Sequence, residues 1–306
     1  MDDESERRKE GVCMPFGLFV VAYLFLAGAG AGSFFFAACG AIYDALRRTA
    51  HTERSLEILL CGFLASPFLL SLASICLLLD LGSPQRALLA FCDPFRSVLS
   101  FGACCLGLLT VVSIAVAALG IAEKFPVSFM RVGCALGIVL APLVMGYTGV
   151  LLCDLVAVDF WNTPFLAALF VCSSLSTGYA SCMLVHVLLQ PLAPPAPRSM
   201  GVLARVLHIA EGTVLVFFMV GRFLYSAAAR ESVLSLLCGW LAPVFWAGVV
   251  LCGLLIPVAA CTIRFQAVLS PPARIVVSSC ALIGGLALRY AVVSAASYTA
   301  IVAPIL

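Results

Sequence analysis

Eight long apolar stretches, separated by short polar segments, dominate the sequence. They cover residues 15–45, 55–79, 98–121, 131–153, 164–188, 204–226, 238–263 and 275–298. Each is long enough to cross the hydrocarbon core of a bilayer, which takes ~20 helical residues. The pattern predicts an all-α polytopic membrane protein with eight transmembrane helices. A proline-rich linker at 191–203 separates helices 1–5 (15–190) from helices 6–8 (204–306), and we expect two four-helix bundles.

Basic residues differ between the two predicted membrane faces. With eight spans, the face that bears the N-terminus holds Arg7, Arg8, Lys9, Arg86, Arg96 and Arg230. The opposite face holds Arg47, Arg48, Arg54, Lys124, Arg131, Arg198, Arg205, Arg264 and Arg274. Because cytoplasmic segments are enriched in Lys and Arg, we expect the second face to be cytoplasmic. Both termini, including a polar tail at 1–14, and the loops 80–97 and 154–163 would then lie outside the cytoplasm.

The composition agrees with a chain immersed in lipid. Hydrophobic residues make up 63% of it and charged residues 10%, which excludes an ordinary soluble domain. The net charge of +2 gives no reason to expect a nucleic-acid partner. Nearly all of the 15 cysteines lie singly in apolar stretches and no CxxC occurs, so we expect no metal centre in this chain.

The segment 147–178 holds a concentration of polar chemistry at the outer face. One apolar helix is expected to end near Cys153, and the next to begin at Thr163-Pro164, where proline in the first turn sacrifices no hydrogen bond. Tyr147 and Asp154 are seven residues apart and would share a helix face. A phenol can donate or accept a hydrogen bond, and Asp154 could pass protons to water. The competing interpretation of Tyr147 is an interfacial aromatic residue.

Ionisable residues within the apolar stretches are the other candidates for chemistry. Glu211 lies about two turns into the sixth stretch and Arg289 near the middle of the eighth. Such side chains are costly in lipid and are expected to have partners. One interpretation is a static Glu211–Arg289 pair that ties two helices together. The other is a proton relay from the cytoplasm through His208 and Glu211, which are three residues apart and share a helix face.

Several segments resemble the NrfD/PsrC family, the quinone-reactive membrane subunits of polysulfide-reductase-type respiratory complexes. They are 147–152 (YTGVLL), 160–164 (FWNTP), 173–178 (SSLSTG), 79–86 (LDLGSPQR) and the pattern Pro94, Ser97, Ser100, Gly102. The resemblance implies a subunit that exchanges electrons between membrane menaquinol or ubiquinol and an extracytoplasmic, ferredoxin-like iron–sulfur subunit, often with a molybdopterin catalytic subunit. It also implies the bacterial cytoplasmic membrane as the location.

The resemblance suggests roles for further residues. Gly28 and Gly32 would either support close helix packing or form a flat surface for the quinone ring. Asp80 and Arg86 could pair across the turn after the second span, within a docking surface for a partner. Trp161 is expected at the quinone site or as an interfacial anchor. The family's quinone pocket also uses polar residues near the start of the first span, where residues 14–23 offer no Asn or His.

Two other classes of function stay open at this stage. In a secondary transporter, Glu211 and Arg289 would form the substrate or coupling-ion site. In a haem b anchor, His186 and His208, which flank the proline-rich linker, would be the axial ligands, since His51 lies in a loop. A neighbouring gene for a cysteine-rich subunit would favour the quinone-reactive interpretation, and an optical spectrum would reveal haem.

Overall fold

The structure, a computed structural model, describes residues 17–47, 54–81, 97–122, 127–155, 158–191, 197–261 and 270–295. Within these ranges every regular element is a helix. The elements are α2 (Leu18–Arg47), α3 (Arg54–Leu60), α4 (Gly62–Leu81), α6 (Val98–Ala122), α7 (Val127–Cys153), α8 (Pro164–Leu189), α9 (Arg198–Tyr225), α10 (Ala227–Leu237), the π-helix η1 (Val244–Leu255), α11 (Ile256–Ala260) and α12 (Pro271–Ser294).

Seven helical segments in the described part are long and apolar enough to cross a membrane. They are Leu18–Tyr43, Leu56–Asp80, Val98–Gly120, Ser128–Cys153, Pro164–Leu189, Ser199–Tyr225 and Pro271–Ser294. They correspond to seven of the eight predicted spans, and they confirm an all-α polytopic membrane protein. The second span is made of α3 and α4, which follow one another with a break at Cys61.

The span predicted at 238–263 is not confirmed at its full length. Its first residues form a turn after α10, and the apolar helix that follows covers only Val244–Ala260. Most of that helix is η1, and Pro257 lies in the first turn of the short α-helix α11. Proline has no N–H to donate, so it suits the first turn of a new helix segment. A count of eight crossings and a division into two four-helix bundles stay predictions.

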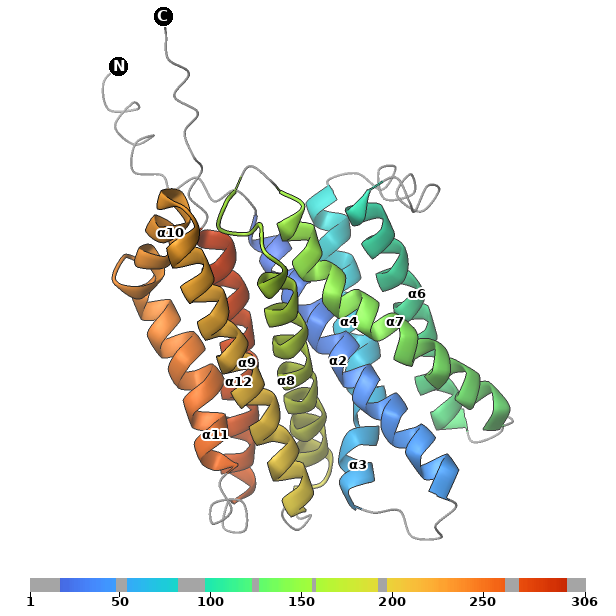
Figure 1. Cartoon of the computed structure of the whole chain (residues 1–306). Coiled ribbons are helices and arrows are strands. Elements are labelled where there is room, and N and C mark those ends of the chain that lie inside the picture. Colours follow the sequence, from blue (N-terminus) through green and yellow to red (C-terminus); the bar gives the residue numbers. More distant parts are fainter. Residues whose placement is uncertain are drawn as a thin grey trace, which may run out of the picture.

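The helices run up and down beside one another, as Figure 1 shows. In that view α2 begins and α12 ends at the upper end of the molecule, together with α10. The lower end is where α9 and α12 begin and where α11 ends. We use "upper end" and "lower end" in this sense below. The start and the finish of the helical bundle therefore lie at the same end.

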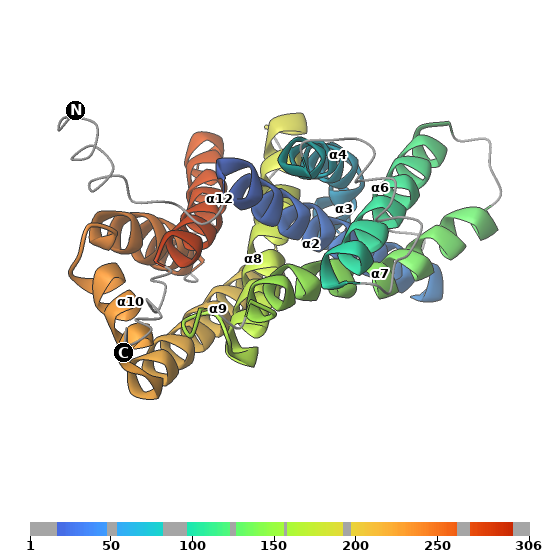
Figure 2. The ribbon, with the colours of Figure 1, turned by 90° about the horizontal axis from the view of Figure 1, so that it is seen from above.

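Helix α8 holds the centre of the bundle. It packs against α2, α4 and α7 on one side and against α9 and α12 on the other. Figure 2, seen along the helices, shows α8 between the group α2, α4, α6 and α7 and the group α9, α10 and α12. Its start matches the sequence prediction, because the Thr163 side chain caps the helix by accepting a hydrogen bond from the Phe165 N–H, and Pro164 follows in the first turn.

Glycines allow α2 and α8 to touch through their backbones. A Cβ atom at Gly32 would overlap the Ser174 carbonyl, and one at Gly178 would overlap the backbone at Gly32 and Ser33. Close contact of this kind is a main source of stability between helices in lipid, where the hydrophobic effect does not drive their association. The serine-rich segment of α8 is thereby pressed against the first helix.

Candidate functional site

A groove between α6 and α7 lies near the upper end, where α6 begins and α7 ends. Its volume is ≈ 470 Å³, and its lining is almost wholly apolar. The lining residues are Ser97, Val98, Phe101, Pro142, Leu143, Gly146, Tyr147 and Val150. This volume is within the range of small-molecule sites, which are usually apolar with a few polar groups. Tyr147 supplies the phenol of this groove.

Tyr147 is held with its ring buried inside the bundle, with 5% of the residue exposed. A Cβ atom at position 102 would overlap the Tyr147 ring, so Gly102 on α6 provides the space in which the ring lies. Gly102 belongs to the family-like pattern, and the structure supplies its physical reason. Pro142, one lining residue of the groove, interrupts the hydrogen bonds of α7 below Tyr147.

The Tyr147 hydroxyl is hydrogen-bonded to the Tyr23 hydroxyl of α2, and the two ring centroids are 6.4 Å apart. Tyr23 is also fully buried. The start of the first span holds no Asn or His, so the polar roles expected there would be vacant or filled by other residues. Tyr23 occupies such a position, and its only signal in the sequence was a phenol within an apolar stretch at a depth similar to that of Tyr147.

Asp154 and Trp161, which were expected near Tyr147, lie in two different environments. Asp154 ends α7: its backbone N–H still donates to the Val150 carbonyl at 2.9 Å, but its side chain is exposed whereas Tyr147 is buried. Trp161 is buried, and its indole N–H donates to the Val292 carbonyl of α12 at 2.9 Å. It therefore anchors the loop to the bundle, an arrangement that neither interpretation of Trp161 anticipated.

Arg222 fastens the same loop from α9. Its guanidinium donates to the backbone carbonyls of Asp159 and Asn162, each at 2.9 Å. Together, the Trp161 and Arg222 hydrogen bonds hold the described residues 158–163 against α9 and α12. Asp80 and Arg86 were expected to pair within a docking surface. Asp80 is exposed near the end of α4, and Arg86 lies outside the described residues.

Gly28 and Gly32 face α8. A Cβ atom at Gly28 would overlap the Ser174 hydroxyl and come within 2.7 Å of the Arg289 guanidinium. The face of α2 that carries both glycines is therefore filled by neighbouring chain. This arrangement supports the packing interpretation, and we do not place a quinone ring there.

Arg289 is fully buried and is bound by uncharged groups. Its guanidinium donates to the Leu24 carbonyl (3.1 Å), the Ser173 hydroxyl (2.9 Å), the Gly285 carbonyl (3.0 Å) and the Ser174 hydroxyl (3.0 Å). Donors of a buried guanidinium must be satisfied, and α2, α8 and α12 all contribute acceptors. Arg289 thus ties three helices together at the centre of the molecule.

Glu211 is close to this cluster, but it is not paired directly with Arg289. Its carboxyl oxygen lies 2.5 Å from the Ser176 hydroxyl of α8. Within the described residues no ion pair within 4.0 Å joins Glu211 and Arg289. The expected direct pair is therefore replaced by an indirect link, in which Ser173 and Ser176 of one α8 turn bind Arg289 and Glu211 respectively. The family-like segment SSLSTG supplies these hydroxyls, a role that sequence analysis did not assign.

The two histidines considered for haem have separate neighbours. His186 Nδ1 lies 3.9 Å from the Cys61 sulfur, and His208 Nδ1 lies 2.7 Å from the Ala204 carbonyl. In the described part of the chain no three His, Cys, Asp or Glu side chains gather as a metal site would require.

These features define a class of protein: a polytopic helical membrane protein with an apolar groove, a buried phenol pair and a central serine–arginine cluster. Comparison with known sequences gives the family. The family model of polysulphide reductase, NrfD, matches residues 7–302, and the chain belongs to that family.

Two curated relatives are similar over parts of their length. A protein NrfD homolog of Haemophilus influenzae is 31% identical over 124 residues, which are 40% of this chain and 39% of the relative. Protein NrfD of Escherichia coli is 30% identical over 173 residues, which are 53% of this chain and 52% of the relative. The matched region thus spans about half or less of the curated relatives.

Proposed function

We propose that this protein is the quinone-reactive membrane subunit of a respiratory oxidoreductase complex, with its quinone site in the groove between α6 and α7. The observation that carries the proposal is the position of Tyr147: a buried hydroxyl at the wall of an apolar groove of ≈ 470 Å³ near the upper end. Apolar walls suit a quinone ring and tail, and the hydroxyl suits a quinone oxygen.

Quinol oxidation releases two electrons and two protons for each quinone formed. Tyr147 would bind and orient one ring oxygen, and Gly102 would keep the phenol in place. Asp154, exposed directly after the end of α7, would take released protons to water. The electrons would leave to a separate iron–sulfur subunit, an acceptor that membership of the NrfD family supports.

The upper surface is the proposed docking face for that iron–sulfur subunit. Trp161 and Arg222 hold residues 158–163 there, close in sequence to the proposed quinone groove. The excess of basic residues in the segments of the lower end supports a cytoplasmic position for that end and an outer position for the upper end. A ferredoxin-like subunit, and with it a molybdopterin subunit, would therefore lie outside the bacterial cytoplasmic membrane.

A groove-filling variant tests the quinone site. Leu143 lines the groove and Val139, one turn away on α7, is 62% exposed and lies outside it. Binding of a short-chain menaquinone analogue is measured on the purified chain in nanodiscs. Leu143→Trp should weaken binding at least about tenfold, which corresponds to ~1.4 kcal/mol, while Val139→Trp should bind as wild type does. Equal binding by both variants would remove the site from this groove.

A further inference from the structure

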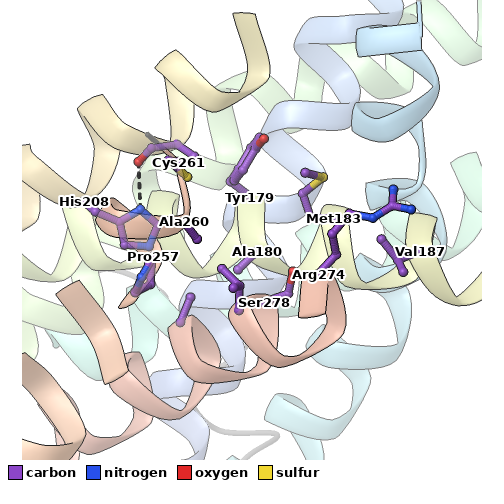
Figure 3. Close-up of a pocket in the computed structure, with 13 residues that line it drawn as sticks. Tyr179, Ala180, Met183, Val187, His208, Pro257, Ala260, Cys261, Arg274 and Ser278 are labelled. Carbon is purple, nitrogen blue, oxygen red and sulfur yellow. Dashed lines mark hydrogen bonds between the residues drawn. The ribbon is translucent and has the colours of Figure 1, made fainter. Parts of the chain in front are cut away.

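A second pocket lies at the lower end, between α8, α9, α11 and α12. Its volume is ≈ 60 Å³, and it is partly open at one side. Figure 3 shows His208 of α9 and Arg274 of α12 on different sides of the pocket, with Tyr179 and Met183 of α8 along its wall. The groove with Tyr147 is at the opposite end of the bundle, so this pocket is a separate site.

His208 is the unusual residue of the pocket. Only 3% of it is exposed, and its Nε2 atom has no hydrogen-bond partner. Its Nδ1 atom lies 2.7 Å from the Ala204 carbonyl, which can only accept. The neutral ring therefore carries its proton on Nδ1, and the lone pair of Nε2 is left without a donor. A buried polar atom in this position calls for a partner that the chain does not provide.

The remaining polar groups around the pocket are few. Tyr179 donates to the Met200 carbonyl at 3.0 Å, and its oxygen can still accept. Ser278 and the Arg274 side chain contribute from α12, and Cys261 follows the last residue of α11. On α9, the Arg205 guanidinium donates to the Cys261 carbonyl at 2.6 Å.

Water fits this combination of size and chemistry. A cavity of ≈ 60 Å³ is small for a quinone ring, whereas a water molecule needs roughly 10–15 Å³ of such space. A buried water also needs two to four polar partners, and His208 Nε2, the Ser278 hydroxyl and the Tyr179 oxygen are available. A chain of a few water molecules would give Nε2 its missing donor and connect it with the lower surface.

Glu211 lies one turn further along α9, on the face of His208. Its environment accommodates either charge state. The Ser176 hydroxyl lies 2.5 Å from Glu211 Oε2 and 3.0 Å from the Ser173 carbonyl, and it has a single proton. When Glu211 is ionised, Ser176 donates to it. When Glu211 is protonated, it donates to Ser176, and Ser176 turns its proton to the Ser173 carbonyl.

We propose that the lower pocket is a water-filled proton port, through which His208 exchanges protons between the aqueous phase at the lower end and Glu211. A proton taken up at Nε2 makes His208 an imidazolium. Loss of this Nε2 proton to the Glu211 carboxylate returns His208 to its neutral form with the proton on Nδ1, and the Ser176 hydroxyl turns to accept a hydrogen bond from the protonated Glu211. The port stands on the lower pocket and the α8–α9 contacts, and it does not require that quinone binds at Tyr147.

Histidine NMR tests the hydration of the pocket, because the chain has 3 histidines and each signal can be assigned by replacing one of them. The full chain is labelled with ¹⁵N-histidine in nanodiscs. We expect neutral His208 to hold its proton on Nδ1. We also expect its unprotonated Nε2 nitrogen to receive magnetisation from the protons of a nearby water molecule. Ser278→Leu fills the pocket and should abolish that transfer. Ser279→Leu, the neighbouring residue outside the pocket lining, should retain it. A His208 without water contact in the wild type would overturn the proposal.

Labelling with dicyclohexylcarbodiimide, which attacks protonated carboxyl groups in membranes, tests the path to Glu211. Reaction at Glu211 is measured by mass spectrometry in vesicles with different pH on the two sides. The rate should rise as the pH of the lower-end compartment falls, and it should not respond to the pH of the upper-end compartment. Ser278→Leu should remove this dependence. A rate that follows the upper-end compartment, or neither compartment, would contradict the port. No quinone is present, so this result is separate from the fate of the quinone proposal.

Discussion

The Tyr23 and Tyr147 hydroxyls share one hydrogen bond inside the bundle, although 124 residues separate them in sequence. Two phenols have two protons, and the bond between them uses one. When Tyr23 donates, the Tyr147 proton is left for a third group, and Tyr147 is the member of the pair that lines the groove. The first and fourth spans are thus joined at the place where a quinone oxygen would be bound.

Gly102→Ala should disturb the groove without altering a polar group. The added methyl group would overlap the Tyr147 ring, and overpacking of this kind typically costs ~1–3 kcal/mol. We expect lower thermal stability and weaker binding of a menaquinone analogue. Gly120→Ala on the same helix is the matched control, because nothing lies within 4 Å of a Cβ at that position. If Gly102→Ala behaves like Gly120→Ala in both measurements, the close contact between Gly102 and Tyr147 does not exist.

Arg289→Lys should destabilise the protein although it keeps the charge. A lysine amine has three donors on a flexible stem and cannot reproduce the planar arrangement that binds Leu24, Ser173, Ser174 and Gly285. Leaving buried acceptors and donors unmatched costs ~1–3 kcal/mol for each group. The measurement is the midpoint of thermal unfolding in detergent.

Arg230→Lys provides the control for Arg289→Lys. Arg230 is exposed, and its guanidinium makes one backbone hydrogen bond, to the Phe223 carbonyl at 3.2 Å. Its replacement should move the midpoint by much less. Equal shifts for the two variants would mean that Arg289 does not tie α2, α8 and α12 together.

Reporter fusions test the orientation in the membrane. The distribution of basic residues predicts that fusions at residues 50, 125 and 195 lie in the cytoplasm and that a fusion at residue 90 lies outside. An alkaline phosphatase reporter should be active only at 90. Activity at 50, 125 and 195 but not at 90 would invert the molecule and move the proposed quinone site to the cytoplasmic face.

The sequence predicted the spans well because long apolar runs follow directly from the thickness of a bilayer. The capped start of α8 at Thr163-Pro164 could also be predicted, since its signals are local. The shortened segment at η1 could not, because a π-helix and an α-helix in lipid have the same apolar composition.

The contacts between helices could not be predicted from the sequence. Helices that are apolar on all sides have no polar face to indicate which side is buried. Tyr23 therefore gave no sign that it meets Tyr147. Glu211 and Arg289 were recognised from the cost of charge in lipid, but the serine turn between them depends on how α8 is rotated. Trp161 was expected at the interface or the quinone site, and it is buried against α12.

The most direct test of the quinone site is the rate of quinol oxidation by the complex that contains Tyr147→Phe. This substitution keeps the ring in its place beside Gly102 and removes only the hydroxyl. Loss of one neutral hydrogen bond costs ~0.5–1.5 kcal/mol, so quinol-dependent turnover should fall roughly threefold to tenfold. Tyr290→Phe, a half-buried tyrosine of α12 outside the groove, should leave turnover unchanged. Electron delivery from a water-soluble donor to the partner subunit should stay normal in both variants. Wild-type quinol kinetics in an assembled Tyr147→Phe complex would show that Tyr147 does not bind the quinone.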